Sequence, residues 1–151
     1  RYVMSEQATL ADKIGSDPTR STVIDECQNL VDDEVKAKRG MSGAAIKLGY
    51  KTVKAIKPGF VRGVIDHLLD DWLTELEPFH GSWQKAGGSF AEFVTARSDE
   101  VAEAMLSVTD RAAGETKHKT AAKMYKKMRP SAKDNVVSAL RKLGAIIEKH
   151  L

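Results

Sequence analysis

The stretch that decides the fold is PGFVRGVIDHLLDDWLTELE, at residues 58–77. Its apolar side chains recur every three or four positions and cover one helical face more than about 100° wide. Pro58 suits the first turn of such a helix, and Pro78 is expected to end it. We therefore predict a long central helix near 58–77, whose inward face comprises Val61, Val64, Ile65, Leu68, Leu69, Trp72, Leu73 and Leu76.

Helical spacing and capping signals continue on both sides of this segment. On the N-terminal side they predict helices over residues 5–14, 17–38 and 42–56. On the C-terminal side a turn-rich corner at 79–88 precedes a short helix that opens at Ser89, followed by helices over 98–113, 116–128 and 130–149. No segment alternates as a strand does. The predicted fold class is all-α, a single-domain multi-helix bundle of about eight or nine helical segments.

Length and composition bound the chain further. With 151 residues, 42% of them hydrophobic, the chain can form one real core and is short for two. Cys27 is the only cysteine, which excludes an intramolecular disulfide and fits a cytoplasmic location. No apolar run approaches the roughly 20 residues that span a bilayer. We expect residues 1–4 to be a cloning remnant or a disordered start, and residues 5–151 to form the domain.

The charged residues are segregated into four blocks of alternating sign. Residues 1–34 carry a net charge of −5, residues 35–65 carry +8 with no acidic residue, residues 66–110 carry −8, and residues 111–151 carry +8. One interpretation is that acidic and basic helices pack side by side and cancel much of each other's field. A dimer held by opposite charges fits the same pattern.

Two of these blocks contain lysines at helical spacing. In each block, three lysines at positions i, i+4 and i+7 form a stripe along one helical face. The first stripe, in the helix predicted over 42–56, is Lys47, Lys51 and Lys54. The second, in the helix predicted over 116–128, is Lys119, Lys123 and Lys126, with Lys127 beside it. Such stripes could neutralise the phosphates of nucleic acid or of an anionic surface. Because no nucleic-acid recognition motif accompanies them, nucleic acid is possible but not favoured.

A group of aromatic residues is the candidate for a ligand pocket. Trp72, Phe79, His80 and Trp83 lie near Pro78 and the pair Gly87-Gly88. Aromatic side chains beside a glycine-rich turn can line a pocket, although they more often close the end of a bundle.

Catalytic and metal-binding chemistry have little support in the sequence. His67 and Asp71 share one helical face, but no second His/Glu pair completes a metal site. Cys27 falls on an apolar face, where a cysteine acts as a small hydrophobe. We therefore predict no catalytic residue, no metal and no cofactor.

Four short motifs resemble those of a family of small, mainly actinobacterial helical proteins whose domain has no known function. They are Val31-Asp32-x-Glu34-Val35, Met41-Ser-Gly-Ala-Ala-Ile-Lys-x-Gly-Tyr50, Leu76-Glu77-Pro78-Phe79 and Ala96-Arg97-x-Asp99-Glu100-Val101-Ala102. The resemblance implies a bacterial origin and a single helical domain, and it carries no functional residue with it. The leading hypothesis is a non-enzymatic protein that acts through contacts with a protein partner or through self-association.

Overall fold

A computed structural model describes residues 8–151, and this part of the chain contains seven helices and no strand. The helices are α1 (Leu10–Ile14), α2 (Thr19–Ala37), α3 (Gly40–Lys54), α4 (Phe60–Ala86), α5 (Phe90–Ala96), α6 (Ser98–Glu115) and α7 (Lys119–Lys149). The predicted all-α bundle is confirmed, with fewer helices than expected. The expectation about residues 1–4 lies outside the described residues. None of the described helices is long and apolar enough to cross a membrane.

Two prolines lie inside helices, and one of them, Pro130, lowers the helix count. Pro78 does not end α4, and Pro130 joins the two predicted C-terminal helices into α7. A proline inside a helix leaves the carbonyl four residues earlier without its hydrogen bond, at a cost of about 3 kcal/mol. Both prolines are exposed, as are Thr74 and Lys126, so water can reach the freed carbonyls. The expectation of a turn-rich corner at 79–88 was therefore wrong.

Burial on the far side of each proline explains why the helix continues. In α4, Leu76 before Pro78 and His80 after it are both buried, so ending the helix would expose part of the core. In α7, Leu140 and Ile147 are buried ten or more residues beyond Pro130. Tertiary packing thus outweighs the local preference.

Five of the predicted helix starts needed correction. α2 begins at Thr19 rather than at residue 17, and α4 begins at Phe60, so Pro58 precedes its first turn. α1 begins at Leu10, because the Thr9 side chain accepts from the Asp12 amide and Asp12 in turn accepts from the Thr9 amide. The part of the predicted helix at residues 5–7 lies outside the described residues. α3 begins at Gly40, two residues before the expected cap at Ser42. α7 begins at Lys119 rather than near residue 116. Ser89 does cap α5, accepting from the Glu92 amide.

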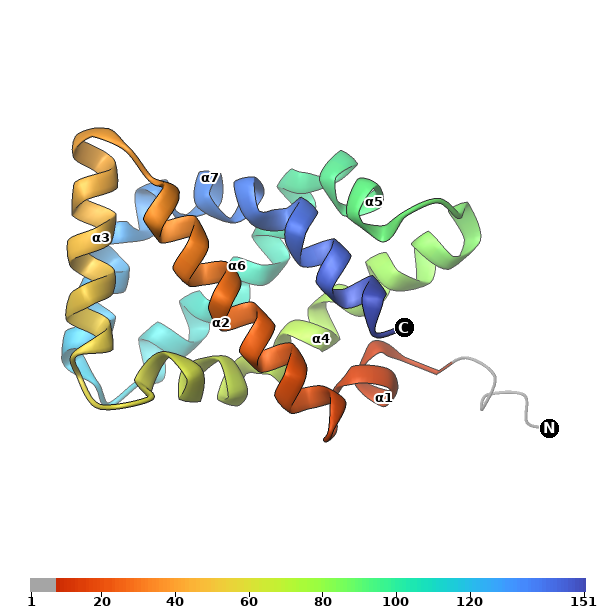
Figure 1. The fold of residues 1–151 in the computed structure, drawn as a ribbon, viewed down its shortest axis with the longest axis horizontal. Coiled ribbons are helices and arrows are strands. Elements are labelled where there is room, and N and C mark those ends of the chain that lie inside the picture. Colours follow the sequence, from red (N-terminus) through yellow and green to blue (C-terminus); the bar gives the residue numbers. More distant parts are fainter. Residues whose placement is uncertain (1–7) are drawn as a thin grey trace.

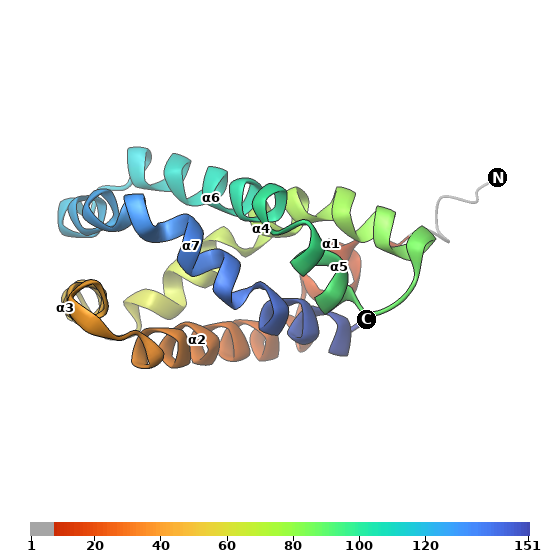
Figure 2. The same ribbon diagram turned by 90° about the horizontal axis from the view of Figure 1, so that it is seen from above.

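Four long helices enclose the interior of the bundle, and α2 and α6 each pack against both α4 and α7. Figure 2 shows α2 and α6 on opposite sides, with α4 and α7 between them. α1 and α5 lie at the end where the C-terminus also lies, and α3 lies at the opposite end (Figure 1). The core is concentrated at the first of these ends, where Leu10, Ile14, Phe90, Val101 and Leu140 are almost fully buried.

Candidate functional site

The end of the bundle next to α3 contains a mostly apolar cavity of about 910 Å³. Its walls come from the C-terminal end of α3, the first half of α4, the second half of α6 and the first half of α7, with Val31 of α2 at one side. The apolar lining includes Tyr50, Val53, Phe60, Val64, Leu68, Leu106, Val108, Met128 and Val136.

Small residues explain why this end of the bundle is not filled. Where the packed end has Phe90 and Phe93, the cavity walls have Gly63, Ala112, Ala121, Ala122 and Ala132. A β-carbon built on Gly63 has no neighbour within 4 Å. Protein interiors normally have few voids larger than a water molecule, so a hollow of this size is a feature in its own right.

Two tyrosines in the cavity wall are held by aspartates on the preceding helices. The Tyr50 hydroxyl of α3 donates to Asp32 Oδ1 of α2 at 2.5 Å. The Tyr125 hydroxyl of α7 donates to Asp110 Oδ1 of α6 at 2.6 Å. Each of the two hairpins, α2–α3 and α6–α7, therefore carries one Asp–Tyr clasp that fixes a ring of the lining.

The second clasp is part of a larger polar group. Arg129 donates to both carboxylate oxygens of Asp110, at 2.8 and 3.2 Å, and Thr109 Oγ1 lies 2.7 Å from the Tyr125 hydroxyl oxygen. The hydrogen bonds from Arg129 and Tyr125 hold the pKa of Asp110 below its usual value. Asp110 is thus charged at neutral pH and keeps Tyr125 oriented as a donor.

Burial and the hydrogen bonds to Asp32 and Asp110 predict that Tyr50 and Tyr125 lose their protons at a higher pH than a free tyrosine does. Burial and the hydrogen bond to Asp110 raise the pKa of Tyr125 to about 12, and burial with Asp32 raises the pKa of Tyr50 as well. Because the unfolded value is about 10, both clasps stabilise the fold below pH 10 and lose that contribution as the pH rises towards 12. We expect tyrosinate absorbance to show two late-titrating groups, one of which disappears in Tyr125→Phe. A Tyr125 step near pH 10 in the folded protein would contradict the clasp.

The cavity opens where its lining residues are themselves exposed. These residues lie at the α3–α4 and α6–α7 turns and on the facing sides of α4 and α6; they are Lys57, Gly59, Gly63, His67, Asp71, Arg111, Glu115, Lys117 and His118. The rings of Phe60 and His118 meet edge to face at 5.0 Å and hold the two turns together. The mouth is therefore polar, with three cationic side chains against two carboxylates.

Ion pairs connect the charge blocks within the chain. They join basic residues to acidic residues on neighbouring helices: Arg20 to Asp66 and Asp70, Arg62 to Asp25, Lys54 to Asp32, Lys142 to Glu34, Lys149 and His150 to Glu26, Arg129 to Asp110, and Lys133 to Asp99 and Glu103. Much of the segregated charge is thus compensated inside the fold.

The predicted lysine stripes lie on neighbouring helices and differ in their pairing. α3 approaches α7 closely, since a β-carbon on Gly49 would lie 2.9 Å from Met128 Sδ. Lys54 is paired with Asp32 at 3.9 Å. The other six lysines of the stripes are exposed and make no ion pair with another described residue; they are Lys47, Lys51, Lys119, Lys123, Lys126 and Lys127.

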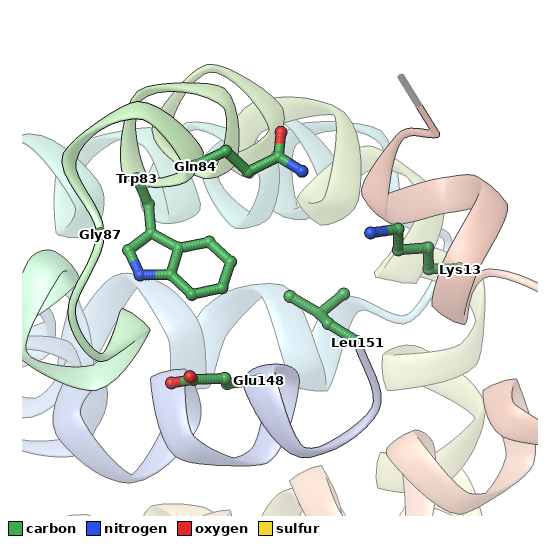
Figure 3. A pocket seen from close by; sticks show the side chains of 6 residues that line it. All are labelled: Lys13, Trp83, Gln84, Gly87, Glu148 and Leu151. Atoms are coloured by element: carbon green, nitrogen blue, oxygen red, sulfur yellow. The ribbon is translucent and has the colours of Figure 1, made fainter. Parts of the chain in front are cut away.

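The four residues predicted to line an aromatic pocket do not surround one opening. Trp72 is half-buried and donates to the Met105 carbonyl, Phe79 packs against the core, and His80 is fully buried. Only Trp83 borders an open hollow of about 510 Å³, with Lys13, Gln84, Gly87, Glu148 and Leu151 (Figure 3). The structure thus brings one of the four residues to an opening, and ligand binding there stays a prediction.

Two titratable groups lie away from the cavity. His80 Nδ1 lies 3.3 Å from Glu77 Oε2, while its Nε2 has no hydrogen-bond partner among the described residues. Burial raises the pKa of the Cys27 thiol to about 11, which keeps it protonated and unreactive at neutral pH. Within residues 8–151, no cluster of three or more His, Cys, Asp or Glu side chains is arranged to hold a metal ion.

Sequence reasoning missed the main cavity. The two Tyr-Lys pairs, Tyr50-Lys51 and Tyr125-Lys126, are the signal that could have pointed to it, since each tyrosine lies in its wall.

Comparison with known proteins gives a match to one family. The model of a family described as "Family of unknown function (DUF6918)" matches residues 10–151, nearly the whole chain. Comparison with curated proteins and with solved structures gave no match.

Proposed function

We propose that this chain, which belongs to the family of unknown function DUF6918, binds an apolar small molecule between α3, α4, α6 and α7. The observation that carries the proposal is the cavity of about 910 Å³. Ligand pockets commonly measure about 300–1,000 Å³ and combine an apolar lining with a few polar groups. The hollow beside α3 has both properties.

The shape of the cavity favours an elongated ligand. Its lining residues on α7 run from Ala121 to Val136, about 22 Å along the helix axis, and on α4 from Phe60 to Asp71, about 16 Å. The polar residues gather at the mouth, near Lys57, Lys117 and His118. A molecule with an apolar chain and one polar end matches this distribution.

The proposed role is binding without catalysis. The hydroxyls of Tyr50 and Tyr125 are both donated to aspartates, so neither is free to act on a ligand in the cavity. Cys27, whose raised pKa keeps it neutral, does not line the cavity. A non-enzymatic protein, with a bacterial origin and a cytoplasmic location, remains our expectation.

Gly63→Phe tests the cavity. The change places a ring at the mouth, where a β-carbon meets nothing within 4 Å. We expect affinity for the neutral fluorescent probe N-phenylnaphthylamine to fall at least about tenfold, equivalent to about 1.4 kcal/mol. Stability should rise by about 0.5 kcal/mol, since phenylalanine is a better helix former than glycine. Fluorescence titration and urea unfolding measure the two effects.

Gly81→Phe is the matched control. Gly81 lies in the same helix, also has no atom within 4 Å of a built β-carbon, and does not line the cavity. It should gain similar stability and keep the affinity of the parent chain. If the parent chain does not bind the probe, or if both variants weaken binding equally, the cavity is not the binding site.

A contact with another molecule is the second candidate function, and one observation favours it. Met41 and Leu48 of α3 are large apolar side chains with 91% and 67% of their surface exposed. Exposed apolar surface of this kind is typical of an interaction site. It supports the hypothesis, made from the sequence, that the protein acts through a partner or a second copy.

A further inference from the structure

Helix α3 carries apolar residues on two opposite faces. Gly43, Ile46 and Gly49 are buried against the bundle. On the opposite face, Met41 and Leu48 lie seven residues apart, about two helical turns, and the alanines between them at 44 and 45 are also exposed. A surface helix normally has one apolar stripe and a polar outer face. The outer face of α3 therefore exposes apolar side chains to water, and no described part of the chain covers them.

Lysines line one edge of this outer face. Lys47 and Lys51 follow the apolar residues at helical spacing and form no ion pair with a described residue. Exposed cations continue on both sides of the helix, at Lys36, Arg39 and Lys57, and residues 35–65 contain no acidic residue. The field around the outer face is consequently positive.

We propose that the outer face of α3, formed by Met41, Ala44, Leu48, Lys47 and Lys51, docks on the surface of an anionic lipid bilayer. A helix that lies in the membrane interface inserts apolar side chains between the headgroups, while lysines beside them attract anionic lipids. The two most exposed large hydrophobic residues in the described part of the chain are both on this face. Charge and apolar exposure thus point to the same surface.

Nucleic acid explains only half of these features. Phosphates attract the lysines, but duplex nucleic acid gives no favourable environment to Met41 and Leu48. The second lysine stripe, on α7, differs from that on α3 in its apolar neighbours. Lys123 and Lys126 are exposed, but Met124 and Met128 beside them are partly buried. A phosphate-binding surface would use both stripes, and a membrane surface would favour α3.

The docking surface is separate from the cavity but lies on the same helix. The inner side of α3 contributes Tyr50 and Val53 to the cavity wall, so docking would bring this wall to the bilayer. The outer residues Met41 and Leu48 do not line the cavity. Membrane docking and ligand binding can therefore be tested independently.

The experiment is co-sedimentation of the full chain with vesicles. We expect binding to vesicles of phosphatidylcholine with phosphatidylglycerol, weak binding to phosphatidylcholine alone, and release by salt. Met41→Ser combined with Leu48→Ser should weaken the binding at least about tenfold, as should Lys47→Glu combined with Lys51→Glu. Because all four side chains are exposed, thermal unfolding should stay close to that of the parent chain.

Lys123→Glu combined with Lys126→Glu is the matched control, since it changes the net charge by the same amount on the other stripe. It should retain most of the vesicle binding. Equal loss in both charge variants, or no binding to anionic vesicles, overturns the proposal. So does a dimer that forms without lipid and is lost in the serine variant, or binding to duplex DNA that outcompetes the vesicles. N-phenylnaphthylamine binding should be unchanged in the serine variant, which separates this result from that for the cavity.

Discussion

Phe90→Ala is expected to lower the free energy of unfolding by about 4 kcal/mol. Phe90 has no exposed surface and lies in a cluster of rings, with its centroid 5.2 Å from that of Trp83 and 6.5 Å from that of Phe93. Truncation removes buried apolar surface and leaves a void that rigid neighbours cannot fill. Because small domains are stable by only about 5–15 kcal/mol, this single change should remove between about a quarter and about four fifths of the total stability.

Urea unfolding followed by circular dichroism measures this loss. Leu48→Ala is the control, because Leu48 is 67% exposed and its truncation should change stability by less than about 0.5 kcal/mol. A loss of under about 2 kcal/mol for Phe90→Ala would show that the end of the bundle around α5 is less tightly packed than the structure indicates.

Gly144→Ala is expected to cost about 3 kcal/mol although it adds a single methyl group. A β-carbon at this position would lie 2.7 Å from Ala91 Cα and 3.0 Å from Val94 Cγ2, so the backbones of α5 and α7 would have to move apart. The absence of a side chain at Gly144 therefore allows the backbones of α5 and α7 to approach closely. The same contact orients Glu148, which accepts a hydrogen bond from the Phe90 amide at 2.8 Å.

Gly114→Ala provides the comparison, since Gly114 lies in α6 with no atom within 4 Å of a built β-carbon. It should raise stability by about 0.5 kcal/mol through helix propensity. Thermal unfolding of both variants separates the steric effect from the change of residue type. If Gly144→Ala also proved stabilising, the close approach of α5 to α7 would be wrong.

The fold class could be predicted because helical periodicity is a local signal. The apolar face of residues 58–77 is present in α4, and Ser89 caps α5 as its sequence suggested. The ends of the long helices could not be predicted, because Pro78 and Pro130 are strong local breakers. What keeps those helices continuous is the burial of residues such as His80 and Leu140, which depends on contacts distant in sequence.

The cavity was beyond sequence reasoning for a related reason. Periodicity shows which face of a helix points inward, but it does not show how much volume the facing side chains fill. In the sequence, the alanines at 121, 122 and 132 are ordinary helix formers. Only the structure shows that they face α3, α4 and α6 across an unfilled space. Charge segregation was visible in the sequence, whereas the specific pairs, such as Arg20 with Asp66 and Asp70, required the structure.

The unequal filling of the two ends of the bundle has a consequence for how such a protein can diverge. Around Phe90 and Gly144, each side chain is fitted to its neighbours, so a change of even one methyl group is costly. Around Gly63 and Ala121 there is free space, and residues can exchange there without disturbing the part that holds the helices together. Descendants of one ancestral chain can thus acquire differently shaped interiors at this end while inheriting the same scaffold.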